Sequence, residues 1–121
     1  YDFNDYKNID KYFLNKGGAD ICYSIDSYNK SLKHVASVYS KKTNMGMELF
    51  SDQPGLQFYT GNMMEQSYHG KYNKNYGIHY AFCLEPQLFP NAINQENFKS
   101  PILKAHDNYT STISMKFRND F

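Results

Sequence analysis

One carboxylate in this chain has neighbours that suit acid–base chemistry. Glu85 lies in the segment 82–97, which reads F-C-L-E-P-Q-L-F-P-N-A-I-N-Q-E-N. The apolar, aromatic run 80–84 predicts a short buried strand that ends at Glu85, and Pro86 and Pro90 then interrupt backbone pairing. A general base benefits from such firm positioning and partial desolvation. On the local pattern alone, a solvated glutamate at a strand end is the simpler interpretation.

Two other polar side chains stand on predicted strands. Asp20 follows Gly17-Gly18-Ala19 and begins a predicted strand over 19–26, and Gln57 lies in a predicted strand over 56–60. Either side chain can contact a ligand. Asp20 can equally cap a turn, and Gln57 can equally face solvent.

Composition excludes several classes of function. The chain has 121 residues, with 13 basic and 12 acidic side chains and a net charge of +1. This length suits one domain at most, and the balanced charge argues against nucleic acid and anionic membranes as partners. No apolar run reaches the roughly 20 residues that cross a bilayer, and residues 1–6 lack the pattern of a signal peptide.

The two cysteines, Cys22 and Cys83, lack the spacing of a metal site. We expect them to be small buried hydrophobes in a reducing, cytoplasmic setting, with one disulfide as the alternative. The sequence therefore predicts no metal ion and no cofactor.

The elements that must position these side chains are predominantly strands. Alternation predicts strands over 19–26, 32–40, 45–49, 56–60, 80–84 and 109–117, a helix or loop around 9–14, and a polar excursion over 61–77. The first three strands resemble a meander, and the pattern as a whole predicts an all-β sandwich. Each strand carries one apolar face, and few residues remain to cover these faces. We therefore expect a partner segment to cover these apolar faces.

Four motifs in order resemble the C-terminal part of the aldose 1-epimerase (galactose mutarotase) family. They are G-G-A-D at 17–20, Q-P-G-L-Q-F-Y-T-G-N at 53–62, C-L-E-P-Q with F-P-N-A-I-N-Q over 83–95, and S-P-I-L-K at 100–104 before the last strand. Their order and spacing match along essentially the whole chain. Ala19 stands where the family often has an aromatic residue, and Pro86 stands where Thr or Ser is also frequent.

The resemblance implies a fold and a set of roles. The fold is a large antiparallel β-sandwich, and residues 1–121 are the C-terminal portion of one domain that is incomplete without a preceding N-terminal segment. The activity is the interconversion of α and β anomers of free aldohexoses such as galactose and glucose. Glu85 matches the general base, Asp20 an acidic residue that hydrogen-bonds sugar hydroxyls, and Gln57 a glutamine that lines the sugar site.

Anomerisation also needs an acid. His79 and Glu85 would lie about 20 Å apart on one continuous strand, which is too far to act on one bond. His34 is expected to be structural, and His69 and His106 to be solvated. In the family the acid is a histidine from the part that precedes this segment, so the resemblance implies that this chain alone is inactive. A non-catalytic carbohydrate-binding or assembly subunit with the same sandwich remains the alternative.

Overall fold

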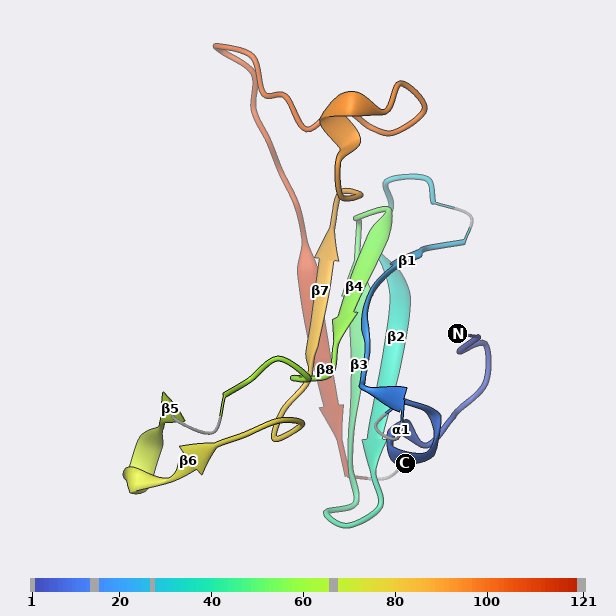
Figure 1. Ribbon diagram of the computed structural model, residues 1–121. Coiled ribbons are helices and arrows are strands. Elements are labelled where there is room, and N and C mark those ends of the chain that lie inside the picture. Colours follow the sequence, from blue (N-terminus) through green and yellow to red (C-terminus); the bar gives the residue numbers. More distant parts are fainter. Residues whose placement is uncertain (1, 14–15, 27, 66–67, 120–121) are drawn as a thin grey trace. The chain divides into compact units, whose positions relative to one another are not determined.

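Strands make up most of the regular structure. The computed structural model describes residues 2–13, 16–26, 28–65 and 68–119 (Figure 1). The strands are β1 (Asp20–Ser24), β2 (Lys33–Ser40), β3 (Met45–Ser51), β4 (Gly55–Tyr59), β5 (Tyr68–His69), β6 (Asn75–Tyr76), β7 (Cys83–Gln87) and β8 (Ile113–Arg118). Helical elements include α1 (Ile9–Tyr12) and the 3-10 turns Lys71–Asn73 and Ala92–Asn94. The prediction of an all-β chain is confirmed.

The strands form three sheets, with the orders β1-β4-β7, β2-β3-β8 and β5-β6. The chain divides into two compact units. The first comprises Tyr1–Ile21 and Gln57–Glu85, and the second comprises Cys22–Leu56 and Pro86–Phe121. Within the described residues, no helix is long and apolar enough to cross a membrane.

Aromatic rings form the core of the first unit. Phe13 and Phe58 are only 1% and 6% exposed, and their rings meet edge to face with centroids 5.6 Å apart. Phe3 stacks on Phe13 at 5.4 Å and lies 6.0 Å from Phe58. Such aromatic clusters bury a large apolar area with few residues, which suits a small unit.

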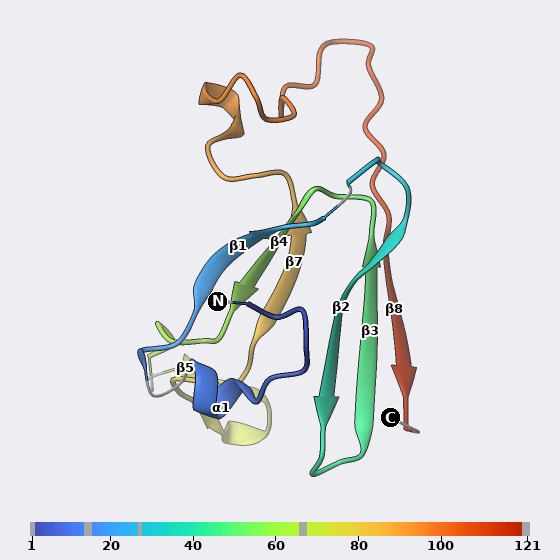
Figure 2. The same ribbon diagram turned by 90° about the vertical axis from the view of Figure 1, so that its right-hand side faces the viewer.

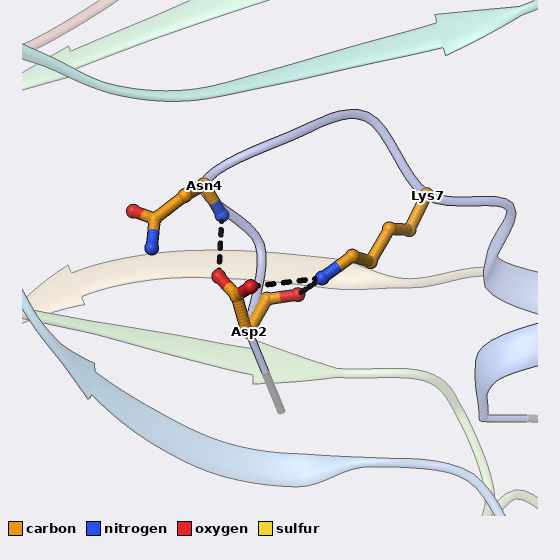
Figure 3. Close-up of polar contacts among 3 residues, drawn as sticks. All are labelled: Asp2, Asn4 and Lys7. Atoms are coloured by element: carbon orange, nitrogen blue, oxygen red, sulfur yellow. Dashed lines mark hydrogen bonds and ion pairs between the residues drawn. The ribbon is translucent and has the colours of Figure 1, made fainter.

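A hydrogen bond and an ion pair stabilise the loop that carries Phe3 (Figure 3). The Asp2 carboxylate accepts a hydrogen bond from the backbone N–H of Asn4 at 2.9 Å and pairs with the Lys7 ammonium at 3.1 Å. These two partners lower the pKa of Asp2. After this loop the Asn8 side chain caps α1 by accepting from the backbone N–H of Lys11 at 3.2 Å.

An antiparallel sheet dominates the second unit, where β3 lies between β2 and β8 (Figure 2). In its register Leu49 is opposite Ala36 on one side and Met115 on the other. Leu49 is fully buried, but Met115 is 54% exposed. On β8 the alternate side chains Ile113 and Phe117 are likewise 49% and 64% exposed. The apolar stripe that the sequence predicted is therefore present but stays open to solvent in this chain.

Two of the predicted strands and the predicted excursion differ from the structure. The predicted meander is wrong for β1, because its neighbour is β4 and not β2. The last strand begins at Ile113 and not at 109, because the groups before it bond the Asp52 side chain instead of a neighbouring strand. The polar excursion over 61–77 also contains the small hairpin β5-β6.

The strand predicted over 80–84 is displaced. β7 starts at Cys83 and runs through Pro86 to Gln87, so Glu85 lies inside the strand and not at its end. A proline is compatible with this position because β7 ends the order β1-β4-β7, and an edge strand tolerates a missing backbone donor. Phe82, expected to be buried, lies outside the strand and is 43% exposed.

The carboxylate of Asp52 links the β3–β4 turn to the start of β8. It accepts hydrogen bonds from the Gln53 amide at 3.0 Å, the Ser111 hydroxyl at 3.1 Å and the Thr112 backbone N–H at 2.9 Å. Burial raises the pKa of Asp52, but these hydrogen bonds more than offset it and the pKa is lowered overall.

We expect Asp52→Asn to lower the free energy of unfolding at pH 7 by on the order of 1 kcal/mol, because an amide nitrogen would face donor groups. Since the folded pKa lies below the unfolded value of about 3.9, the ionised carboxylate stabilises the fold above that pH and loses this effect as the pH falls. Urea unfolding between pH 3 and 7 should therefore show the two proteins converging in acid. Asp26→Asn, at an exposed position, is the control. A constant difference across this range would contradict the assignment.

Candidate functional site

Asp20 is the first residue of β1, where the sequence placed it, and its side chain is exposed. Two glycines with left-handed backbones precede it, Gly17 with φ of 86° and Gly18 with φ of 87°. Few residues other than glycine adopt this conformation readily, so this G-G pair turns the chain into the strand.

Gln57 lies on β4 and contacts Asp20 directly. Its amide Nε2 donates a hydrogen bond of 2.5 Å to Asp20 Oδ1. The Gln57 carbonyl oxygen Oε1 is buried and has no hydrogen-bond partner among the described residues. Asp20 Oδ2 is therefore the acceptor of this pair that remains open to hydroxyl groups, while the Gln57 amide fixes the orientation of the carboxylate.

Glu85 lies on β7, the strand next to β4, and is exposed. Among the described residues it bonds neither Asp20 nor Gln57. Cys83 is two positions before it on the same strand and is exposed, so the prediction that this cysteine is buried is wrong. Desolvation raises the pKa of the Cys83 thiol, and the charge of Glu85 and a hydrogen bond with its side chain raise it further.

Contacts farther along the three strands show which sheet face these side chains occupy. Cys22 of β1 receives a 3.9 Å hydrogen bond from the Gln87 side chain of β7. A Cβ on Gly55 of β4 would lie 3.1 Å from the Cys22 sulfur. Cys22, Gly55 and Gln87 are therefore on one face, and side chains two positions apart share a face.

Asp20, Gln57 and Glu85 are each two residues from one of these three positions. The alternation therefore puts all three predicted site residues on one face of adjacent strands, in the order β1-β4-β7. The two exposed carboxylates on this face can accept hydrogen bonds from a polyol and take a proton from one of its hydroxyls. Within the described part of the chain, no group of three or more His, Cys, Asp or Glu side chains is arranged to hold a metal ion.

Sequence reasoning missed the residue that fixes the start of β1. Thr60 follows β4, and its buried hydroxyl accepts from the Ala19 N–H at 2.7 Å and donates to the Ala19 carbonyl at 3.2 Å. The Thr60 N–H adds a bond to the same carbonyl at 2.9 Å. The Y-T-G-N end of the second motif contained this residue, but a threonine after a strand carries no signal of its role.

Gly18 is packed tightly beneath this contact. A Cβ there would lie 2.5 Å from Asn62 Cβ, 2.6 Å from Thr60 Oγ1 and 2.8 Å from His79 Cε1, whereas a Cβ on Gly17 would meet none of the described residues within 4 Å. The two glycines thus have the same backbone conformation but very different surroundings.

This contrast gives a matched pair of variants. Gly17→Ala should cost about 1 kcal/mol of folding free energy for the left-handed backbone alone. Gly18→Ala should cost clearly more, because the added methyl group must displace buried neighbours and shift Asp20. Thermal or urea unfolding measures both costs. Equal destabilisation by the two variants would contradict the packing described for Gly18.

Comparison with known proteins follows the same motifs. The family model for aldose 1-epimerase matches residues 1–116. The chain is 32% identical to the galactose mutarotase of Bos taurus over 111 residues. The matched stretch covers 92% of this chain and 32% of that protein. It is 33% identical over 106 residues to that of Sus scrofa, covering 88% and 30% of the two chains.

The galactose mutarotase of Homo sapiens is 32% identical over 111 residues, again 92% of this chain and 32% of the relative. The chain thus spans about a third of the length of the curated relatives it matches. These matches confirm the resemblance seen in the four motifs and, with the strand-rich structure, the expected relation to the family's β-sandwich. The chain belongs to the aldose 1-epimerase family.

Proposed function

We propose that the protein carrying this chain is an aldose 1-epimerase that interconverts the α and β anomers of free aldohexoses such as galactose and glucose. The observation that supports this proposal is the common sheet face of Asp20, Gln57 and Glu85. Family membership supplies the reaction class, and relatives named galactose mutarotase suggest the sugar. No nucleic acid, membrane or cofactor enters the proposal, and a cytoplasmic location is part of it.

In the proposed mechanism Glu85 removes the proton from the C1 hydroxyl while an acid protonates the ring oxygen. The C1–O5 bond then breaks, C1 turns about the C1–C2 bond, and the ring recloses with either configuration. Asp20 Oδ2 accepts a hydrogen bond from a sugar hydroxyl and orients the ring, while Gln57 holds the Asp20 carboxylate in place. On ring closure Glu85 returns its proton to the C1 oxygen while the acid's conjugate base takes the proton back from O5, so no proton is gained or lost overall.

We expect Glu85→Gln to lower kcat for galactose anomerisation by about 10²- to 10⁴-fold, which is the usual contribution of a general base. Polarimetry on freshly dissolved α-D-galactose measures the rate above the spontaneous one. Glu96→Gln, which removes an exposed carboxylate elsewhere, is the matched control. A Glu85→Gln enzyme with the wild-type rate would remove Glu85 from the mechanism.

A second readout tests the position of Glu85 without reference to activity. Because the Glu85 side chain raises the pKa of Cys83, the Glu85→Gln variant should alkylate Cys83 at lower pH than the wild type. The pH dependence of Cys22 alkylation should not move, since burial is the main cause of its raised pKa. If the Cys83 profile is unchanged, the two side chains are not neighbours.

The same proposal treats residues 1–121 as the C-terminal portion of one epimerase domain that needs a preceding segment. The chain spans about a third of its relatives, and the apolar stripe of β8 is about half exposed or more, with Ile113, Met115 and Phe117 at 49%, 54% and 64%. Side chains with this alternation are expected to be covered in a complete fold.

We therefore expect the 121-residue chain alone to anomerise galactose no faster than buffer and to bind a dye for exposed apolar surface. A protein extended to the length of its relatives should show the enzymatic rate and lose most of the dye binding. Polarimetry and dye fluorescence on the two proteins make the comparison. Catalysis by the 121-residue chain alone would refute the split site.

The same two proteins distinguish the enzyme from the non-catalytic alternative, a carbohydrate-binding or assembly subunit. This alternative predicts that the extended protein binds galactose in calorimetry but shows only the spontaneous rate. It also predicts that Glu85→Gln leaves binding unchanged.

A further inference from the structure

His79 occupies the turn before β7 in an unusual conformation. Its backbone φ is 62°, in the left-handed region that few residues other than glycine adopt. Its backbone N–H donates to the Gly61 carbonyl at 3.1 Å, and its ring Nδ1 bonds the Thr60 carbonyl at 2.8 Å. Because β7 starts only at Cys83, His79 and Glu85 are not on one continuous strand. The separation of about 20 Å expected for these two residues on one strand therefore does not apply.

The ring hydrogen bond decides the tautomer of His79. A backbone carbonyl only accepts, so Nδ1 must carry the hydrogen, and Nε2 of the neutral ring is left as an acceptor. Within the described residues nothing bonds Nε2. The hydrogen bond to Thr60 therefore occupies one ring nitrogen and fixes the orientation of the ring.

The ring instead lies against the backbone that leads into Asp20. Its Cε1 is 2.8 Å from the place a Gly18 Cβ would occupy, so the ring fills the space that glycine leaves. Thr60, whose carbonyl holds the ring, also makes three hydrogen bonds to Ala19. One connected set of contacts thus runs from His79 through Thr60 and Ala19 to Asp20.

We propose that His79 is a positioning residue for sugar binding: its ring holds the Gly18–Ala19 backbone so that Asp20, clamped by Gln57, keeps Oδ2 directed at a substrate hydroxyl. This inference rests on the proposed function. A left-handed histidine costs conformational energy, and such strain persists where the surrounding contacts over-determine it, often beside functional groups.

The main test compares His79→Ala with His79→Asn in the protein extended to the length of its relatives. Alanine loses the bond to Thr60 and disfavours the left-handed backbone, so the KM for galactose should rise about tenfold while kcat falls less. Asparagine tolerates this backbone and can place a donor near the position of Nδ1, so it should restore KM to within about threefold of wild type. His69→Ala, at an exposed histidine of β5, should change neither constant.

A double-mutant cycle with Asp20→Asn asks whether His79 acts through Asp20. If it does, His79→Ala should raise KM much less in the Asp20→Asn background than in the wild type. Multiplicative effects in the double variant would overturn the proposal, as would an unchanged KM in His79→Ala. If His79→Ala does not fold, the cycle is run with His79→Gln, whose amide reaches the position of Nε2 and not that of Nδ1.

Two measurements separate this inference from the proposed function. Nitrogen NMR of the His79 imidazole in the wild-type protein should show hydrogen on Nδ1. Hydrogen on Nε2 alone would rule out the hydrogen bond from Nδ1 to the Thr60 carbonyl, whatever the activity. Galactose affinity measured by calorimetry repeats the comparison without catalysis. A wild-type protein that binds galactose but does not anomerise it would refute the proposed enzyme while the His79 comparison still decides the positioning role. A wild-type protein that neither binds nor converts galactose would overturn both.

Discussion

The three hydrogen bonds between Thr60 and Ala19 are the constraint on which the candidate site depends. They join residues 41 positions apart in sequence and lie in a fully buried place, since both residues are 2% exposed. A buried hydroxyl must be satisfied as donor and as acceptor, and here one backbone residue satisfies both roles. Because Asp20 is the next residue, these bonds fix its backbone position independently of the contact that its own side chain makes.

The bond from Gln57 to Asp20 then completes the arrangement. Its donor stands on the central strand β4, and its acceptor stands on the neighbour β1. A charge-assisted bond of this kind is stronger than a neutral one, but it forms only if the two strands are already in register. The Thr60 bonds therefore hold the start of β1, and the Gln57 bond selects one orientation of the carboxylate.

Much of this architecture could be predicted from local pattern. Alternation gave β2, β3 and β4 nearly correct bounds, and Gly17-Gly18 marked the start of β1. Local pattern failed where distant groups decide the outcome. Asp52 takes the hydrogen bonds of the residues before β8, so that strand starts late. Strand pairing is likewise non-local, and period-2 alternation carries no information on which strand lies beside β1.

The same limit applies to the site. The types and motifs of Asp20, Gln57 and Glu85 singled them out, but their common sheet face follows only from contacts of Cys22 with Gln87 and of Cys22 with Gly55. The distance expected for one straight strand from 79 to 85 does not apply to His79, because β7 begins only at Cys83. A left-handed residue between two strands cannot be recognised from its side-chain type, since the packing around it supplies the energy that holds it.

The strand order also determines how far apart the backbones of Asp20, Gln57 and Glu85 lie. Neighbouring strands lie about 4.8 Å apart, so β1 and β7 are separated by about 10 Å across β4. Gln57 in the middle touches Asp20 directly, whereas the backbones that carry Asp20 and Glu85 are two strand spacings apart. Under the proposed function this separation suits one monosaccharide ring, with Asp20 bound to a hydroxyl remote from C1 and Glu85 at C1 itself. A pair in direct contact would instead compete for one proton, so the intervening strand is what allows one carboxylate to bind the sugar while the other acts as a base.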